Sequence, residues 1–124
     1  MLWFVIGAGG ALGAIARHAV NHYVHQRALS STFPFGIFLI NVAGSIAIGL
    51  VAGLLASERL HLSNTWRTFV IVGFLGGFTT FSSFSLDTLA LVRGGHHAQA
   101  FWNAGGQVGL SLAGVWLGFR LGGG

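Results

Sequence analysis

The sequence predicts an all-α membrane protein, a single domain of four transmembrane helices over residues 1–124. Two properties of its composition indicate this class: 53% of the residues are hydrophobic and only 6% are charged, whereas a soluble domain carries about a quarter of its residues as charged side chains. The third observation is the pattern along the chain, where four long apolar stretches alternate with short polar segments. The length allows one small domain.

Each apolar stretch is long enough to cross a bilayer, whose hydrocarbon core of about 30 Å needs about 20 apolar residues in a helix. The predicted spans are residues 2–22, 35–55, 66–91 and 98–121. No basic segment precedes the first span, so we expect a helix that is retained, not a cleaved signal peptide. Four crossings joined by short links place both termini on the same side.

The arginines give this chain little preference for one orientation in the membrane. All six Lys/Arg residues are arginine, and the two predicted faces hold three each: Arg59, Arg67 and Arg120 against Arg17, Arg27 and Arg93. This balance leaves two interpretations open, a dual-topology antiparallel homodimer and a fixed orientation decided by one or two residues. Because a tight four-helix bundle fills its own centre with side chains, a water-filled path requires an oligomer.

Several classes of function are not expected from this sequence. The arginines are scattered singly, so no nucleic-acid partner is predicted. The chain has no cysteine, which excludes disulfides, thiol catalysis and cysteine-based metal sites. It also lacks nucleotide-binding and hydrolase motifs, so we do not expect an enzyme.

The stretch GFLGGFTTFSSFS, residues 73–85, interrupts the third span with glycines and hydroxyls. We expect the helix to break at Gly76 and Gly77, because hydroxyl residues follow the glycine pair at once, and the carbonyls that a break frees could hold a cation. The alternative is that these glycines only allow close packing. Phe78, Phe81 and Phe84 recur every three residues along one helical stripe. Such a stripe usually serves packing, but ring edges carry positive potential and can favour a small anion.

Polar side chains also occur in the other spans, where they mark either a function or a buried partner. Asn41 in the second span offers two N–H donors that could meet an anion or form an interhelical hydrogen bond. Gln107 and Ser111 form a polar track in the fourth span, which Asn103 continues and Val115 ends. Taken alone, this track is best explained by hydrogen bonds between helices.

The first span carries small and basic residues with two interpretations each. Gly9 and Gly13 have GxxxG spacing, which serves an internal helix contact more often than a subunit contact. Arg17 either extends to the membrane surface or gives positive potential to an anion vestibule. The histidines of this segment are expected at the interface, since no acidic or cysteine partner for a metal stands near them; they are His18, His22 and His25.

Three motifs together closely resemble the CrcB/Fluc family of fluoride channels: GGALGAIAR at residues 9–17, NVAGSIAIG at 41–49 and GFLGGFTTFSSFS at 73–85. The resemblance spans most of the chain. It implies a dual-topology homodimer in the bacterial inner membrane, with two antiparallel pores through which fluoride leaves passively. It also implies a structural sodium ion at the subunit interface, held by the main-chain carbonyls of Gly76 and Thr79.

The resemblance further implies which side chains meet the ion. The expected pore residues are Asn41, Thr80, Phe81, Ser83, Phe84, Gln107 and Ser111, and the expected vestibule residue is Arg17. Asp87 and Val115 depart from the family pattern, where Glu and a hydroxyl residue are common. Two rival functions stay open, a small proton-coupled multidrug-type exporter and a non-conducting membrane assembly subunit. The exporter would need a carboxylate in mid-membrane, where neither Glu58 nor Asp87 is expected.

Overall fold

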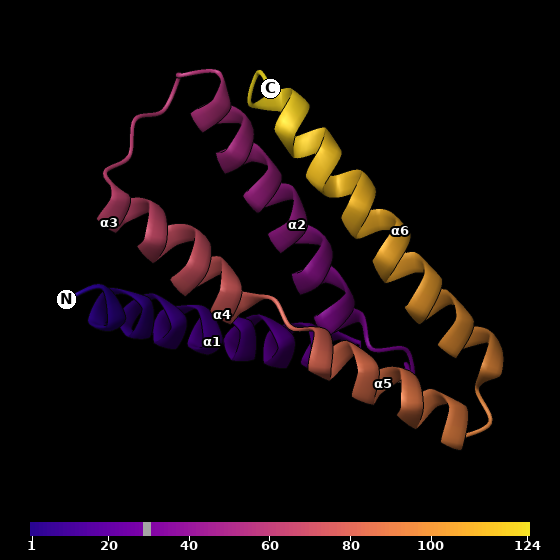
Figure 1. The fold of residues 1–124 in the computed structure, drawn as a ribbon. Coiled ribbons are helices and arrows are strands. Elements are labelled where there is room, and N and C mark those ends of the chain that lie inside the picture. Colours follow the sequence, from indigo (N-terminus) through magenta and orange to yellow (C-terminus); the bar gives the residue numbers. More distant parts are fainter. Residues whose placement is uncertain (29–30) are drawn as a thin grey trace.

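A computed structural model describes residues 1–28 and 31–124, so Leu29 and Ser30 of the first predicted link lie outside the described residues. The described residues form helices and links without any strand, which confirms the all-α prediction (Figure 1). The helical elements are α1 (Leu2–Arg27), α2 (Phe35–Ala56), α3 (Asn64–Arg67), the π-helical segment η1 (Thr68–Leu75), α4 (Gly76–Phe78), α5 (Phe81–Arg93) and α6 (His97–Leu121). The segments from α3 to α5 together form the third crossing.

Glycines let α1 pack closely on the third crossing. A Cβ on Gly9 would lie 2.7 Å from the Phe69 carbonyl oxygen, and one on Gly13 would lie 2.8 Å from the Phe78 nitrogen. The GxxxG pair therefore serves an internal helix contact, as its spacing favours. Because later residues of α1 meet later residues of the third crossing, the two run parallel, as alternating crossings require.

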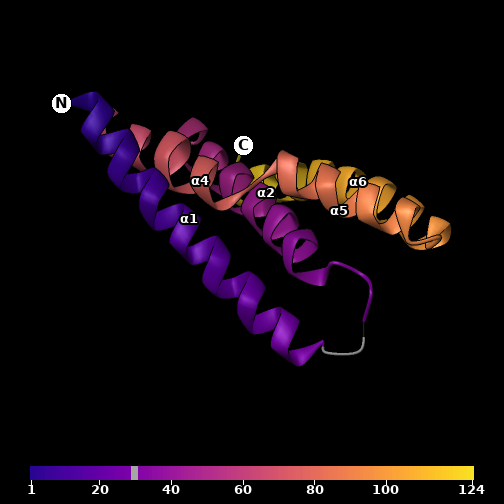
Figure 2. The same cartoon turned by 90° about the horizontal axis from the view of Figure 1, so that it is seen from below.

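A second glycine seam joins α2 to α6, which lie side by side in Figure 1. A Cβ on Gly49 would lie 2.9 Å from the Val115 carbonyl carbon, and one on Gly53 would lie 2.9 Å from that of Phe119. These two helices are therefore also parallel. The N-terminus, the C-terminus and the α2–α3 link lie toward one end of the molecule, and the α5–α6 turn lies toward the other (Figures 1 and 2).

Three of the four predicted spans are long and apolar enough to cross a membrane within the described part of the chain: α1, α2 and the third crossing, Asn64–Arg93. The fourth, α6, has a suitable length of 25 residues, but its polar and glycine residues lower its hydropathy. Because α6 packs parallel to α2 along a shared seam, we expect α6 to cross the membrane wherever α2 does. The fourth crossing remains a prediction.

The third crossing breaks at Thr79 and Thr80, not at Gly76 and Gly77. Both threonines have extended backbones, with φ/ψ of −82°/156° and −155°/121°, whereas Gly76 is helical at −63°/−37°. A Cβ on Gly77 would lie 2.9 Å from the Cα of Gly10. The position predicted for the break was wrong because this glycine serves close packing against α1.

Candidate functional site

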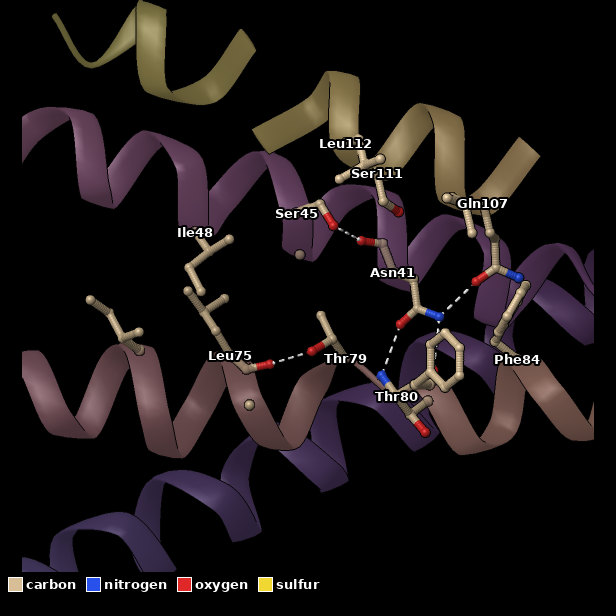
Figure 3. Close-up of a pocket in the computed structure, with 15 residues that line it drawn as sticks. Asn41, Ser45, Ile48, Leu75, Thr79, Thr80, Phe84, Gln107, Ser111 and Leu112 are labelled. Atoms are coloured by element: carbon tan, nitrogen blue, oxygen red, sulfur yellow. Dashed lines mark hydrogen bonds between the residues drawn. The ribbon is translucent and has the colours of Figure 1, made fainter. Parts of the chain in front are cut away.

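A hollow of about 540 Å³ lies beside the break, between α2, the third crossing and α6 (Figure 3). Its wall mixes amides, hydroxyls, aliphatic groups and aromatic rings. It contains every predicted site residue except Arg17 and Ser83, namely Asn41, Gly76, Thr79, Thr80, Phe81, Phe84, Gln107 and Ser111. Residues far apart in the sequence therefore meet at one site, and none of the residues lining it is a carboxylate.

Asn41 pairs with the backbone of Thr80 at the break. In a continuous helix the Thr80 N–H would donate to the Gly76 carbonyl; here it donates to Asn41 Oδ1 at 2.8 Å, while Asn41 Nδ2 donates to the Thr80 carbonyl oxygen at 2.9 Å. Both polar atoms of Thr80's backbone are thus satisfied from α2. The Gly76 carbonyl loses its usual helical donor, and Gly76 lines the hollow.

The helix restarts after the break with a side-chain cap. Thr80 Oγ1 accepts a hydrogen bond from the Ser83 N–H at 3.2 Å, the N-cap geometry that threonine favours. The same hydroxyl lies 3.1 Å from Ser82 Oγ and donates to Ser83 Oγ at 3.3 Å. Thr80 and Ser83 therefore form one hydroxyl cluster next to the hollow.

Asn41 uses both of its N–H groups within the protein. Besides the Thr80 carbonyl, Nδ2 donates to Gln107 Oε1 at 2.7 Å, and Gln107 Nε2 donates to Asn103 Oδ1 at 2.9 Å. The interhelical hydrogen bond, one of the two interpretations of Asn41, is thus present. Ser111 also lines the hollow, and the hydrogen bonds among the described residues leave its hydroxyl free for a ligand.

The two predicted pore rings lie on the far side of the break from Phe78. The Phe81 and Phe84 ring centroids are 5.1 Å apart and their planes are inclined by 50°. Phe84 packs in the core against Ile37 and Ile40, whereas Phe81 is 74% exposed. The expectation of a single three-ring stripe is wrong, because the break turns the chain between Phe78 and Phe81.

Arg17 reaches the break from α1. Its Nη1 donates to the Thr79 carbonyl oxygen at 3.4 Å, a long hydrogen bond. The guanidinium therefore brings positive charge to the carbonyl end of the interrupted helix. The contact with the broken backbone fixes where the guanidinium lies, and the vestibule role of Arg17 stays a prediction.

The remaining titratable groups lie away from the large hollow. His18 and His22 stack with ring centroids 6.3 Å apart, and no group of three or more His, Cys, Asp or Glu residues suited to a metal occurs in the described residues. Asp87 lines a second hollow of about 240 Å³ between α1, α2 and α5. Glu58 is exposed in the α2–α3 link with a φ of 57°.

Two further residues belong to the hydrogen-bond network, and only one of them was named from the sequence. Asn103, which continues the polar track by its spacing, is completely buried and lies against α5. Thr88 accepts a hydrogen bond from Asn103 Nδ2 at 2.9 Å and donates to the Phe84 carbonyl oxygen at 2.8 Å. The i, i+4 spacing of Asn103 and Gln107 is a signal for the first; no sequence pattern points to the second.

These features define a small multi-pass membrane protein with a polar hollow beside a broken helix. The family model described as "CrcB-like protein, Camphor Resistance (CrcB)" matches residues 4–119, and the chain belongs to this family. It is 48% identical over 121 residues to "Fluoride-specific ion channel FluC 2" of Nitrobacter hamburgensis, covering 98% of this chain and 96% of the relative.

Two further relatives carry the same kind of name. The "Fluoride-specific ion channel FluC" of Opitutus terrae is 48% identical over 118 residues, with 94% of this chain and 89% of the relative covered. The "Fluoride-specific ion channel FluC 1" of Symbiobacterium thermophilum is 43% identical over 122 residues, with 98% of each covered. The family is thus one of ion channels, not of enzymes.

Proposed function

We propose that this chain is a fluoride-selective channel that lets fluoride leave a bacterial cell passively across the inner membrane and so reduces fluoride toxicity. The names of its relatives, which match over nearly the whole chain, support the substrate. The observation that carries the proposal is the hollow beside the break, whose wall offers uncharged donors and aromatic rings without a carboxylate. Such a wall suits an anion that must bind and leave again.

The ion would meet neutral groups along its path. Fluoride loses part of its water and exchanges it for the hydroxyls of Thr80, Ser83 and Ser111 and the amides of Asn41 and Gln107. The edges of Phe81 and Phe84 carry the positive end of the ring quadrupole, so they favour an anion without holding it as a lysine would. Arg17 adds positive potential that draws anions toward the break.

The functional unit in this proposal is an antiparallel homodimer with two pores. One chain leaves the hollow incompletely enclosed, since several residues that line it are exposed, including Phe81, Val108 and Leu112. An inverted second copy would cover them and complete the wall. The balanced arginines allow both orientations to be inserted.

A structural sodium ion at the dimer interface fits the donor set of the break. Sodium prefers oxygen ligands, and in membrane proteins the carbonyl ends of broken helices supply them. Gly76 and Thr79 both line the hollow and lie at such an end. Two carbonyls cannot enclose a cation, so the second copy would supply two more. The ion would hold the subunits together without moving, and thorough sodium removal should therefore abolish fluoride flux.

The test is transport by the purified protein in liposomes loaded with fluoride and chloride, each followed with a selective electrode. Fluoride efflux far faster than chloride efflux, at zero proton gradient, is the expected result. Efflux that follows a proton gradient and is lost in Asp87→Asn would indicate an exporter instead. No flux of either ion would indicate an assembly subunit.

A further inference from the structure

A chain of side-chain hydrogen bonds connects the break in the third crossing to a point two turns further along α5. It begins where Asn41 holds Thr80 and passes to Gln107, with 2.7 Å between Asn41 Nδ2 and Oε1. It continues through Asn103 at 2.9 Å to Thr88 at 2.9 Å. It ends on the Phe84 carbonyl oxygen, 2.8 Å from Thr88 Oγ1. We call these four side chains, Asn41, Gln107, Asn103 and Thr88, the amide relay.

The backbone fixes the direction of every hydrogen bond in the amide relay. The Thr80 N–H can only donate, so the oxygen of Asn41 must face it and the nitrogen must face Gln107. The oxygen of Gln107 then accepts, its nitrogen donates to Asn103, and Asn103 in turn donates to Thr88. At the far end the Phe84 carbonyl can only accept, which matches the remaining hydroxyl proton of Thr88.

Burial makes this arrangement rigid. Asn103 is 0% and Gln107 is 3% exposed, so little or no water can replace a lost partner. A buried donor or acceptor without a partner costs about 1–3 kcal/mol. If the Gln107 amide were rotated by half a turn, its N–H groups would face the N–H groups of Asn41. Its oxygen would then face the oxygen of Asn103. The Gln107 oxygen is therefore held on Asn41.

We propose that Thr88 and Asn103 are positioning residues that hold the Gln107 carbonyl oxygen on Asn41, so that an anion must displace a fixed carbonyl to reach the Asn41 amide. This inference rests on the proposed fluoride channel function and adds a source of selectivity to it. Fluoride concentrates its charge on a small ion and is a strong hydrogen-bond acceptor, so it competes with a carbonyl oxygen. Chloride is larger and a weaker acceptor, and it competes poorly.

The experiment compares Thr88→Val, which removes the hydroxyl at nearly the same volume, with Thr88→Ser, which keeps it. Ser85→Ala is the matched control, because Ser85 Oγ donates to the Phe81 carbonyl in the same helix but is outside the amide relay. The readout is the ratio of fluoride to chloride efflux from the same liposomes, which does not depend on the number of folded channels. If Thr88→Val does not assemble, Thr88→Ala takes its place.

We expect the ratio to fall about two- to tenfold in Thr88→Val, the effect of weakening one net hydrogen bond. It should stay at the wild-type value in Thr88→Ser and Ser85→Ala. An unchanged ratio in Thr88→Val overturns the inference, even if the flux of both ions falls together, because a merely structural role lowers both equally.

A second readout needs no transport: hydrogen exchange of the Asn41 side-chain amide, followed by NMR in detergent. Loss of the Thr88 hydroxyl should speed this exchange about two- to tenfold, and Thr88→Ser should restore it. Unchanged exchange overturns the positioning role whatever the protein transports. If the wild-type protein passes no fluoride, the proposed function and the selectivity argument are both overturned. The exchange result still decides whether Thr88 positions Asn41.

Discussion

Asn41 is the residue on which the broken backbone depends most directly. It supplies the acceptor for the Thr80 N–H and a donor for the Thr80 carbonyl, two groups that would otherwise lack partners in a region without bulk water. Its replacement therefore disturbs the break itself as well as the wall of the hollow.

We predict that Asn41→Leu lowers both the thermal stability of the assembled protein and its fluoride flux. The expected loss of stability is about 1–3 kcal/mol for each backbone group left without a partner, measured by thermal unfolding in detergent. Ser45→Ala is the control, because Ser45 lies one turn further along α2 at the same hollow and donates only to the Asn41 main-chain oxygen. Wild-type stability in Asn41→Leu would show that the break does not need this amide.

Phe81 allows a cleaner test of the rings than Phe84. Phe84 is buried in the core, whereas Phe81 is 74% exposed in one chain, so Phe81→Ile creates no cavity within the protomer. If ring edges favour the ion, fluoride flux in liposomes should fall about two- to tenfold while the dimer remains assembled, the effect of losing one aromatic interaction of about 0.5–1.5 kcal/mol. Phe101→Ile is the control, because Phe101 is an exposed ring of α6 that lies outside the hollow, and this variant should conduct fluoride normally. Normal flux in Phe81→Ile would remove the rings from the mechanism.

At the scale of elements, glycine seams set how closely the crossings approach. Along α1, Gly13 faces the backbone of the third crossing, whereas Gly7 faces open space, with no atom within 4 Å of a Cβ built there. The two positions lie in the same helix and differ only in what they contact. They form a matched pair for testing the seam.

We predict opposite outcomes for Gly13→Ala and Gly7→Ala. Alanine is the better helix former, so Gly7→Ala should leave the protein as stable as the wild type or slightly more stable. In Gly13→Ala the added methyl group would meet backbone atoms that cannot move aside, and forced overpacking costs about 1–3 kcal/mol. Thermal unfolding and the yield of assembled protein after detergent extraction measure this. A stable Gly13→Ala would mean that α1 can separate from the third crossing without loss.

The sequence allowed prediction of the helical class, the interrupted third crossing and most residues of the hollow, since composition, span length and a specific motif all indicate them. The position of the break was not predictable from local pattern. Two glycines suggest a break, but Gly77 is needed for packing against Gly10, and Thr80 leaves the helix because Asn41, 39 residues away, satisfies its backbone. Thr88 was missed for the same reason: its role is set by a partner on another helix.

At the scale of the whole molecule, the proposed inverted pair would account for two separate observations. A second, inverted copy would complete the incompletely enclosed hollow, and the equal division of arginines between the predicted faces gives the insertion machinery little preference. Topology is therefore the property that tests the assembly most directly.

We predict that each orientation accounts for about half of the molecules, since the arginine count that sets orientation is balanced. The chain has no cysteine, so Gly124→Cys introduces a single label at the C-terminus. A membrane-impermeant thiol reagent applied to intact cells should modify about half of it, and the rest only after permeabilisation. Adding Arg59→Gln and Arg67→Gln removes two of the three arginines from one face. The labelled fraction should then move far from one half. Fluoride flux should also fall, because unequal populations leave some chains without an inverted partner. Labelling that is complete or absent in the parent chain, with fluoride flux intact, would contradict the antiparallel dimer.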